Sequence, residues 1–136
     1  MIQIEIYEEF EKWLSDILEN NDMPENTAAF NFNLYEESAE EHLYSIQLVA
    51  AGEFDPDDSE GNWACDEIWS CEENIFTVDI SDEESTDKDH AFELFREMCA
   101  EYLECGQYKG VLLGVKAVGI GFIDGEIDVF YNADKE

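Results

Sequence analysis

The fold class is indicated most clearly by Ala117–Asn132, whose sequence is AVGIGFIDGEIDVFYN. Two runs of alternating apolar and polar residues flank Asp124 and Gly125, a pair that favours the tight turn of a β-hairpin. Alternation of this kind is typical of strands with one buried face. The last part of the chain is therefore expected to form two antiparallel strands.

The same alternation predicts further strands earlier in the chain. One run is centred on Phe32, and a second extends from about Leu43 to Ala50. A polar turn separates the two, so they are expected to form another hairpin. The segments WACDEIW (63–69) and NIFTVDIS (74–81) are two further strand candidates.

Two segments have the apolar spacing of amphipathic helices. The first has its apolar positions from Tyr7 to Leu18 and is expected to end near Asn20 and Asn21, before Pro24. The second extends from about Lys88 to Cys105, with Ser85 or Thr86 available as an N-terminal cap and Gly106 as a C-terminal stop. Helices and strands do not alternate regularly, as they would in a parallel sheet.

This order predicts an α+β fold, with a mostly antiparallel sheet of about five or six strands and two main helices on one face. Residues 1–136 are expected to form a single acidic domain, because the chain has no linker or repeat and is long enough to bury a core. Its aromatic content of 13% also favours a folded protein over a disordered acidic one.

The charge restricts the possible partners. The chain has 36 Asp and Glu residues against 6 Lys and Arg residues, a formal net charge of −30. Nucleic acid and anionic membranes are excluded as partners, because both repel such a surface. Capture of a cationic protein is favoured instead.

The expected location is the cytoplasm. No segment is apolar for long enough to span a bilayer, and the N-terminus lacks the basic and hydrophobic regions of a signal peptide. The four cysteines should therefore remain reduced.

A second informative stretch is Phe54–Trp69, FDPDDSEGNWACDEIW, which combines six carboxylates with Trp63 and Trp69. Indoles surrounded by carboxylates have the composition of a binding site for a basic partner. At least one of the two tryptophans is also expected to be structural. We therefore expect this stretch to contact a protein.

A calcium site in the same stretch is the weaker interpretation. Counting from Asp55, oxygen-bearing residues occupy positions one, three, five and twelve of a calcium loop. However, Glu60 stands where the loop needs glycine, and Asp66 replaces the bidentate Glu of position twelve. The flanking segments are predicted strands and not helices. A calcium-binding module remains an alternative, but no metal site or other cofactor is expected.

The cysteines and histidines do not predict a metal site either. The cysteines form two pairs, each separated by five residues, whereas zinc ligands are usually two to four residues apart. They are Cys65, Cys71, Cys99 and Cys105, and we expect them to be buried thiols that act as small hydrophobic side chains. His42 and His90 have no second histidine at helical spacing.

No pattern in the chain indicates catalysis. So many carboxylates create Asp/Glu pairs by chance, and the serines lie in no nucleophile-elbow sequence. GVKAVGIG (114–121) is not preceded by the strand-and-helix pattern of a phosphate-binding loop. We therefore expect a protein that is not an enzyme.

A small acidic α+β chain of this kind, with GNWACDEIW after an acidic turn, resembles the immunity proteins of bacterial toxin–immunity systems. These systems include contact-dependent growth inhibition and polymorphic toxins. The resemblance implies a cytoplasmic toxin inhibitor that binds a toxin domain, often a nuclease, and blocks its active site. It concerns overall character and assigns no binding residue.

The binding residues are instead predicted from charge and aromatic content. The carboxylates would replace substrate phosphates in a basic toxin domain, and an indole would anchor the complex. The predicted partner-binding residues are Asp55, Asp57, Asp58, Glu60, Trp63, Asp66, Glu67, Trp69, Glu72 and Glu73. A second acidic cluster, formed by Asp82, Glu83, Glu84, Asp87 and Asp89, would join them if the fold brings both to one edge. A DNA mimic that inhibits a DNA-binding protein is the main alternative.

Overall fold

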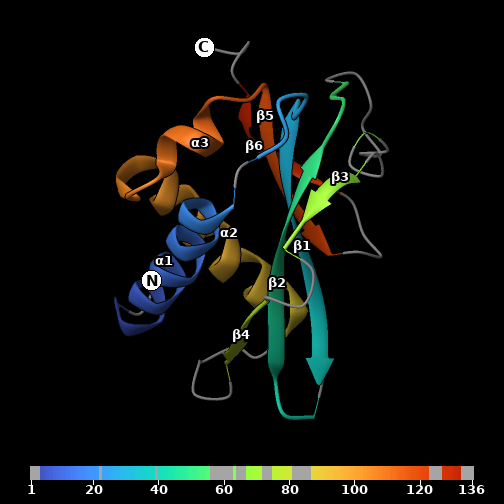
Figure 1. Cartoon of the computed structure of the whole chain (residues 1–136). Coiled ribbons are helices and arrows are strands. Elements are labelled where there is room, and N and C mark those ends of the chain that lie inside the picture. Colours follow the sequence, from blue (N-terminus) through green and yellow to red (C-terminus); the bar gives the residue numbers. More distant parts are fainter. Residues whose placement is uncertain are drawn as a thin grey trace.

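Figure 1 shows the computed structural model of the chain. The structure describes residues 4–21, 23–38, 40–55, 63, 67–71, 75–80, 87–122 and 127–132. The helices are α1 (Ile4–Asn20), α2 (Lys88–Cys105) and α3 (Lys109–Leu113). The strands are β1 (Ala29–Ser38), β2 (Leu43–Ala51), β3 (Glu67–Ser70), β4 (Phe76–Asp79), β5 (Ala117–Phe122) and β6 (Asp128–Asn132). The predicted α+β class is confirmed.

The strands form one sheet in the order β3-β2-β1-β5-β6, and β4 also pairs with β2. All the pairs are antiparallel except β1 and β5, which are parallel. The helices cover one face of this sheet (Figure 1). The mostly antiparallel sheet with two main helices on one face was therefore predicted correctly. The short helix α3 was not predicted.

The parallel pairing of β1 with β5 follows from the path of the chain. After β4 the chain passes through α2 and α3 before it forms β5. A parallel pair needs a long crossover of this kind, whereas antiparallel neighbours can be joined by tight turns. The hairpins β1–β2 and β5–β6 were both predicted from alternation and are confirmed.

β3 and β4 form one edge of the sheet, with an interruption between them. β3 pairs with the end of β2 and β4 with its beginning. Between them the backbone N–H of Cys71 donates to the carbonyl oxygen of Leu48 at 3.0 Å, and the N–H of Leu48 donates to Cys71 Sγ at 3.3 Å. The thiol thus provides the acceptor that a regular strand would provide. Of the strand predicted over 63–69, Glu67–Trp69 lies in β3 and Trp63 is not in a strand, while residues 64–66 lie outside the described part.

The ends of α2 differ in part from the prediction. Its N-terminal cap is Asp87, whose carboxylate accepts a hydrogen bond of 2.8 Å from the backbone N–H of His90. The proposed caps Ser85 and Thr86 lie outside the described residues, and the prediction that one of them caps the helix is wrong. Gly106 follows the last helical residue, as predicted.

The main core lies between the helices and the sheet. Alternate residues of β1, such as Phe30 and Phe32, face the helices and are fully buried. Tyr102 of α2 is also fully buried, and its hydroxyl lies 2.8 Å from Ser15 Oγ of α1 and accepts a hydrogen bond of 3.2 Å from the N–H of Tyr108. This hydroxyl connects both main helices to the segment that precedes α3.

Three buried or half-buried tyrosines predict a loss of stability in alkaline solution. Burial raises the pKa of Tyr35, Tyr44 and Tyr102 above the ordinary value of 10.0. Because the folded state holds these protons more tightly than the unfolded chain does, their contribution to stability is complete below about pH 10 and is lost as the pH rises through the folded pKa values. Urea denaturation at a series of pH values, followed by circular dichroism, should show this decrease.

Tyr102→Phe provides the internal comparison for this prediction. The variant should start from a lower stability at neutral pH, because the N–H of Tyr108 loses its acceptor, but its stability should then fall less steeply above pH 10. Tyrosinate absorbance measures the same titration directly. If all tyrosines ionised together near pH 10 in the folded protein, the prediction would be wrong.

Candidate protein-binding surface

The structure describes four of the ten predicted partner-binding residues: Asp55, Trp63, Glu67 and Trp69. Asp55 and Glu67 are exposed. Glu67 pairs with Ala51 at the end of β2, and Asp55 follows Ala51 by four residues, so both lie at the same end of the sheet. The other six, Asp57, Asp58, Glu60, Asp66, Glu72 and Glu73, lie outside the described residues.

Trp63 is a core residue, so its prediction as a partner-binding residue is wrong. Its side chain is only 2% exposed and packs on the sheet face opposite the helices. Its ring stands edge-on to that of Phe54, with 5.0 Å between the centroids. Small side chains, Ala29, Ala51 and Ala117, form the remaining buried part of this second cluster and leave room for the indole. The expectation that at least one tryptophan is structural is confirmed.

Trp69 remains available as an aromatic anchor. It is half-buried, pairs with Ala50 and packs against the main core. Phe76 lies further along the same edge, opposite Ile46, and is half-buried as well. Trp13 of α1 is also half-buried and contacts Phe76, with 5.9 Å between ring centroids. Trp13 and Phe76 were not among the predicted partner-binding residues.

The described part of the second acidic cluster lies at the other end of the sheet. Asp87 precedes Lys88, whose Nζ is 4.5 Å from the centre of the Phe122 ring. Phe122 pairs with Leu34 of β1. Asp55 instead lies near the other end of β1, where Ala29 pairs with Ala51. Five residues of strand separate these positions, which is roughly 17 Å at ~3.3 Å per residue. The two acidic regions therefore do not form one patch through their described members.

Carboxylates also extend along the outer side of α2, and this row was not predicted. Asp89, Glu93, Glu97 and Glu101 are all exposed and recur every four residues, so they form a row along one side of the helix. Like charges at this spacing each destabilise a helix by about 0.2–0.5 kcal/mol. Helix stability therefore does not account for the row.

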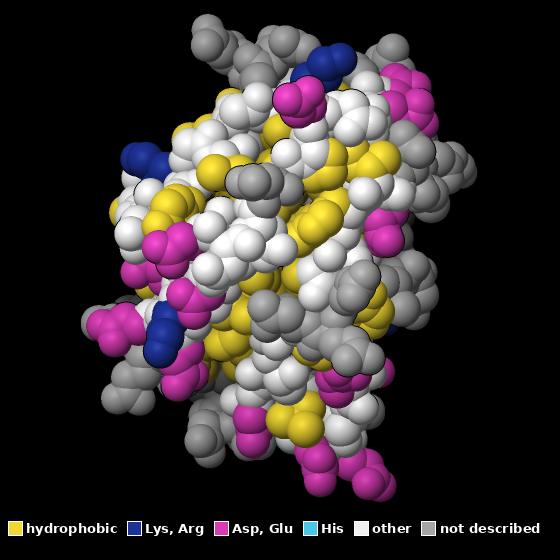
Figure 2. Space-filling view, in the orientation of Figure 1, with side chains coloured by type: hydrophobic (Ala, Val, Ile, Leu, Met, Phe, Trp, Pro, Cys, Tyr) yellow, Lys and Arg dark blue, Asp and Glu magenta, His cyan; other side chains and the backbone are white. Residues whose placement is uncertain are grey.

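Figure 2 shows carboxylates over the helices and at the lower end of the molecule, with an apolar band between the acidic areas. The lower end is the turn between β1 and β2, where Glu36, Glu37, Glu40 and Glu41 are exposed. An apolar centre with a charged rim is the usual composition of a protein-binding surface. This side of the protein thus has the features expected of an interface.

The sheet face opposite the helices differs from this acidic side. Its centre contains buried and half-buried amides and a hydroxyl: Asn31 Nδ2 donates to Asn33 Oδ1 at 2.6 Å, and the Tyr35 hydroxyl donates to Gln47 Oε1 at 2.8 Å. Within the described part of the chain, Asn31 Oδ1 is buried without a hydrogen-bond partner. The described side chains at this centre are therefore uncharged and add nothing to the acidic surface.

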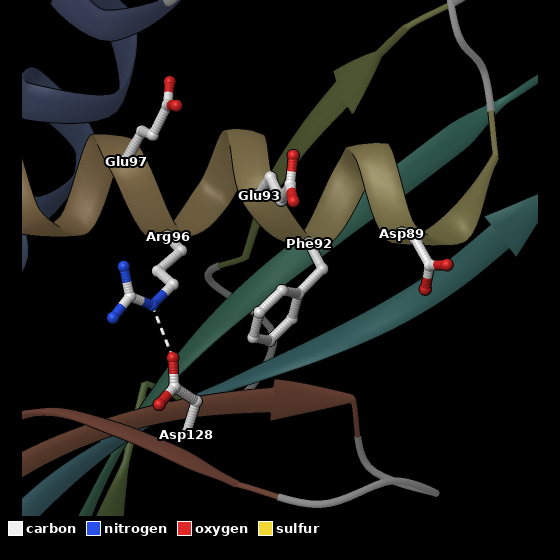
Figure 3. A pocket seen from close by; sticks show the side chains of 6 residues that line it. All are labelled: Asp89, Phe92, Glu93, Arg96, Glu97 and Asp128. Carbon is white, nitrogen blue, oxygen red and sulfur yellow. Dashed lines mark hydrogen bonds and ion pairs between the residues drawn. The ribbon is translucent and has the colours of Figure 1, made fainter.

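A groove lies between α2 and β6 (Figure 3), with a volume of about 630 Å³. It is lined by Asp89, Phe92, Glu93, Arg96, Glu97 and Asp128. Phe92 and Arg96 point from α2 toward β6, and Glu97 points away from the strand. Arg96 Nε donates to Asp128 Oδ2 in an ion pair whose side chains are 42% and 43% exposed. The groove therefore contains several carboxylates, one aromatic ring and one cation.

The described residues offer no metal site. Among them, no group of three or more His, Cys, Asp or Glu side chains could hold a metal ion. The possible calcium loop cannot be compared with the structure, because most of residues 55–66 lie outside the described part. In the described ranges, moreover, no helix is both long and apolar enough to cross a membrane.

The described cysteines differ in their surroundings. Cys99 is buried, and burial raises the pKa of its thiol, as expected for a cysteine that acts as a small hydrophobic side chain. Burial also raises the pKa of the half-buried Cys71. Cys105 is exposed at the end of α2, so the prediction of a buried thiol is wrong there. Its Sγ lies 3.5 Å from the hydroxyl of Tyr7 and donates to the carbonyl oxygen of Glu101 at 3.2 Å.

The chain matches no known protein family, and comparisons with curated proteins and with solved structures found no match.

Proposed function

We propose that this protein is an immunity protein, which binds and neutralises a cognate basic toxin domain by covering its active site. The observation that carries the proposal is the charge of −30 on a folded scaffold, with exposed carboxylates along the helices and at both ends of the sheet. A surface of this kind attracts a cationic partner over long distances and raises the association rate by about 10–10³-fold.

A nuclease domain fits this surface best among basic toxin domains. Nucleases bind the phosphate backbone through Lys and Arg side chains. Carboxylates such as those of the α2 row carry the same charge as phosphates and would occupy those positions. Close charge pairs in protein complexes of this type couple by about 1.5–7 kcal/mol, so a few desolvated pairs are enough for tight binding. Half-exposed aromatics such as Trp69 and Trp13 would add apolar contact area.

Toxin neutralisation can be tested directly in bacterial cells. The toxin candidate is the C-terminal domain encoded by the reading frame beside the gene for this chain. Expression of that domain alone should stop growth, and coexpression of this chain should restore it. The purified complex should show no nuclease activity. Growth arrest that continues despite coexpression and a confirmed level of the chain would contradict the proposal.

The electrostatic part of the proposal is tested by salt and by charge removal. Raising the NaCl concentration should slow association steeply, because exposed charges more than about 8–10 Å apart are screened near physiological ionic strength. The combined variant Glu93→Gln, Glu97→Gln and Glu101→Gln should bind more weakly than the wild type. Thermal denaturation of the free chain is the control, since salt should raise its melting temperature by screening repulsion between carboxylates. Association that does not respond to salt would exclude electrostatic capture.

The coexpression experiment also distinguishes an immunity protein from a DNA mimic. A mimic would bind a DNA-binding protein that is not a toxin, and duplex DNA would compete with it for that protein. Coexpression would then restore no growth, because the neighbouring domain would not be its target.

A further inference from the structure

We infer that the groove between α2 and β6 receives one arginine side chain of the partner, and that Arg96 occupies part of this site in the free protein. This inference rests on the proposed function in that it assumes a cationic protein partner. It adds the position of one contact and the chemistry of the group that is bound there.

The way in which Arg96 is held shows what the groove can bind. Its Nε donates to the carboxylate of Asp128 on β6, and its guanidinium carbon lies 6.0 Å from the centre of the Phe130 ring. A carboxylate and an aromatic ring are the two groups that proteins commonly use to bind a guanidinium. The groove thus already contains its expected ligand as an internal side chain.

The groove has charge and space for a second cation. Four carboxylates and one guanidinium line it, which gives a formal charge of −3, from −4 and +1. Arg96 is paired with Asp128, and no other described cation lines the groove. The negative charges of Asp89 and Glu93 are therefore not neutralised by a cation of the groove. Its volume of about 630 Å³ lies within the range of sites that bind small ligands. A side chain from a partner can therefore enter beside Arg96.

The aromatic ring of Phe92 favours arginine over lysine. Figure 3 shows Phe92 in the groove between Asp89 and Arg96, pointing toward β6. A guanidinium is planar and weakly hydrated, so it can stack on such a ring while it donates hydrogen bonds in its own plane. An ammonium group is compact and strongly hydrated and gains less in this position.

Arg96 can leave its position without disrupting the fold. Both partners of its ion pair are more than 40% exposed, and an ion pair of this kind contributes little to stability. When the partner's arginine binds, Asp128 can exchange one guanidinium for another. Arg96 and the incoming side chain therefore compete for the same carboxylate.

The test uses a small probe and does not need the toxin. N-acetyl-arginine amide is titrated into the isotope-labelled full chain, and backbone amide shifts are followed by NMR. The neutral isostere N-acetyl-citrulline amide and N-acetyl-lysine amide are the comparison probes. Weak binding of the arginine probe is expected, with shifts concentrated at Phe92, Arg96 and Asp128, little effect of the lysine probe and none of citrulline.

Three variants make the test specific. Arg96→Met keeps the apolar part of the side chain and removes its charge, so it should tighten binding of the arginine probe by about two- to fivefold. Asp128→Asn should weaken binding. Glu9→Gln removes the same charge from the exposed surface of α1, away from the groove, and should have little effect. Unchanged amide spectra elsewhere show that the variants are folded.

The inference is overturned by any of three results. The arginine and citrulline probes could give equal shifts, Glu9→Gln could weaken binding as much as Asp128→Asn does, or Arg96→Met could weaken binding. The first two would mean that the groove does not select cations, and the third that Arg96 builds the site and does not compete for it. None of these results affects toxin neutralisation in cells, so failure of the groove and failure of the proposed function can be distinguished.

Discussion

Replacement of Trp63 by alanine is expected to lower the free energy of unfolding by about 3–5 kcal/mol, the usual cost of a large-to-small change at a buried aromatic. The indole is 2% exposed and fills the space between Phe54 and the alanines of the second cluster. Since those neighbours are small, they cannot close the cavity. Urea denaturation followed by far-ultraviolet circular dichroism measures the change without relying on tryptophan fluorescence.

Trp69→Ala is the matched control for this prediction. Trp69 is half-buried, so the same substitution should cost clearly less stability, while it should weaken binding to the toxin domain. Trp63→Ala should instead reduce binding only as far as it unfolds the protein. Equal losses of stability in the two variants would mean that Trp63 does not have the structural role assigned to it.

The second large effect is expected at Gly106. Its backbone is extended, with φ −67° and ψ 148°, so the glycine is not needed for a left-handed conformation. It is needed for space, because a Cβ atom at this position would lie 2.5 Å from Cδ1 of the buried Tyr102 ring. Tyr102 cannot move away easily, since its hydroxyl is hydrogen-bonded to Ser15 and to the N–H of Tyr108. Gly106→Ala should therefore destabilise the protein by about 1–3 kcal/mol.

Gly110→Ala is the control for Gly106→Ala. Gly110 lies in α3, and a Cβ atom there would meet nothing within 4 Å. Alanine favours helices over glycine by about 0.8–1.0 kcal/mol, so this variant should be as stable as the wild type or more stable. Thermal and urea denaturation of both variants measure the contrast. If both substitutions had the same effect, contact with the Tyr102 ring could not be its cause.

Much of the fold could be predicted because alternation and helical spacing are local properties. The run around Phe32, the alternation on both sides of the Asp-Gly pair near the C-terminal end, and the periodicity of α2 each depend on residues close in sequence. The parallel contact of β1 with β5 could not be predicted in the same way, because it joins segments more than eighty residues apart. Likewise, the position of Asp87 next to the first helical residue matters more for capping than the identity of Ser85 or Thr86.

The candidate site was less predictable for a similar reason. Trp63 has an acidic sequence environment, but its burial depends on Ala29 and Ala117, which are distant in sequence and adjacent in the sheet. The carboxylate row of α2 could have been found from its four-residue spacing in a predicted helix. The groove could not, since Arg96 and Asp128 come from different elements.

The central position of β1 has a consequence for synthesis of the chain. β1 and β2 are complete by residue 51, but the neighbour on the other side of β1 is translated only at residues 117–122. Until then one edge of β1 is open, next to apolar residues that β5 and the later helices α2 and α3 help to cover. An open edge of this kind can pair with another chain. The acidic first half of the nascent polypeptide opposes such contacts, since two copies repel each other. We therefore expect the abundance of carboxylates to oppose aggregation of chains that have not yet formed β5.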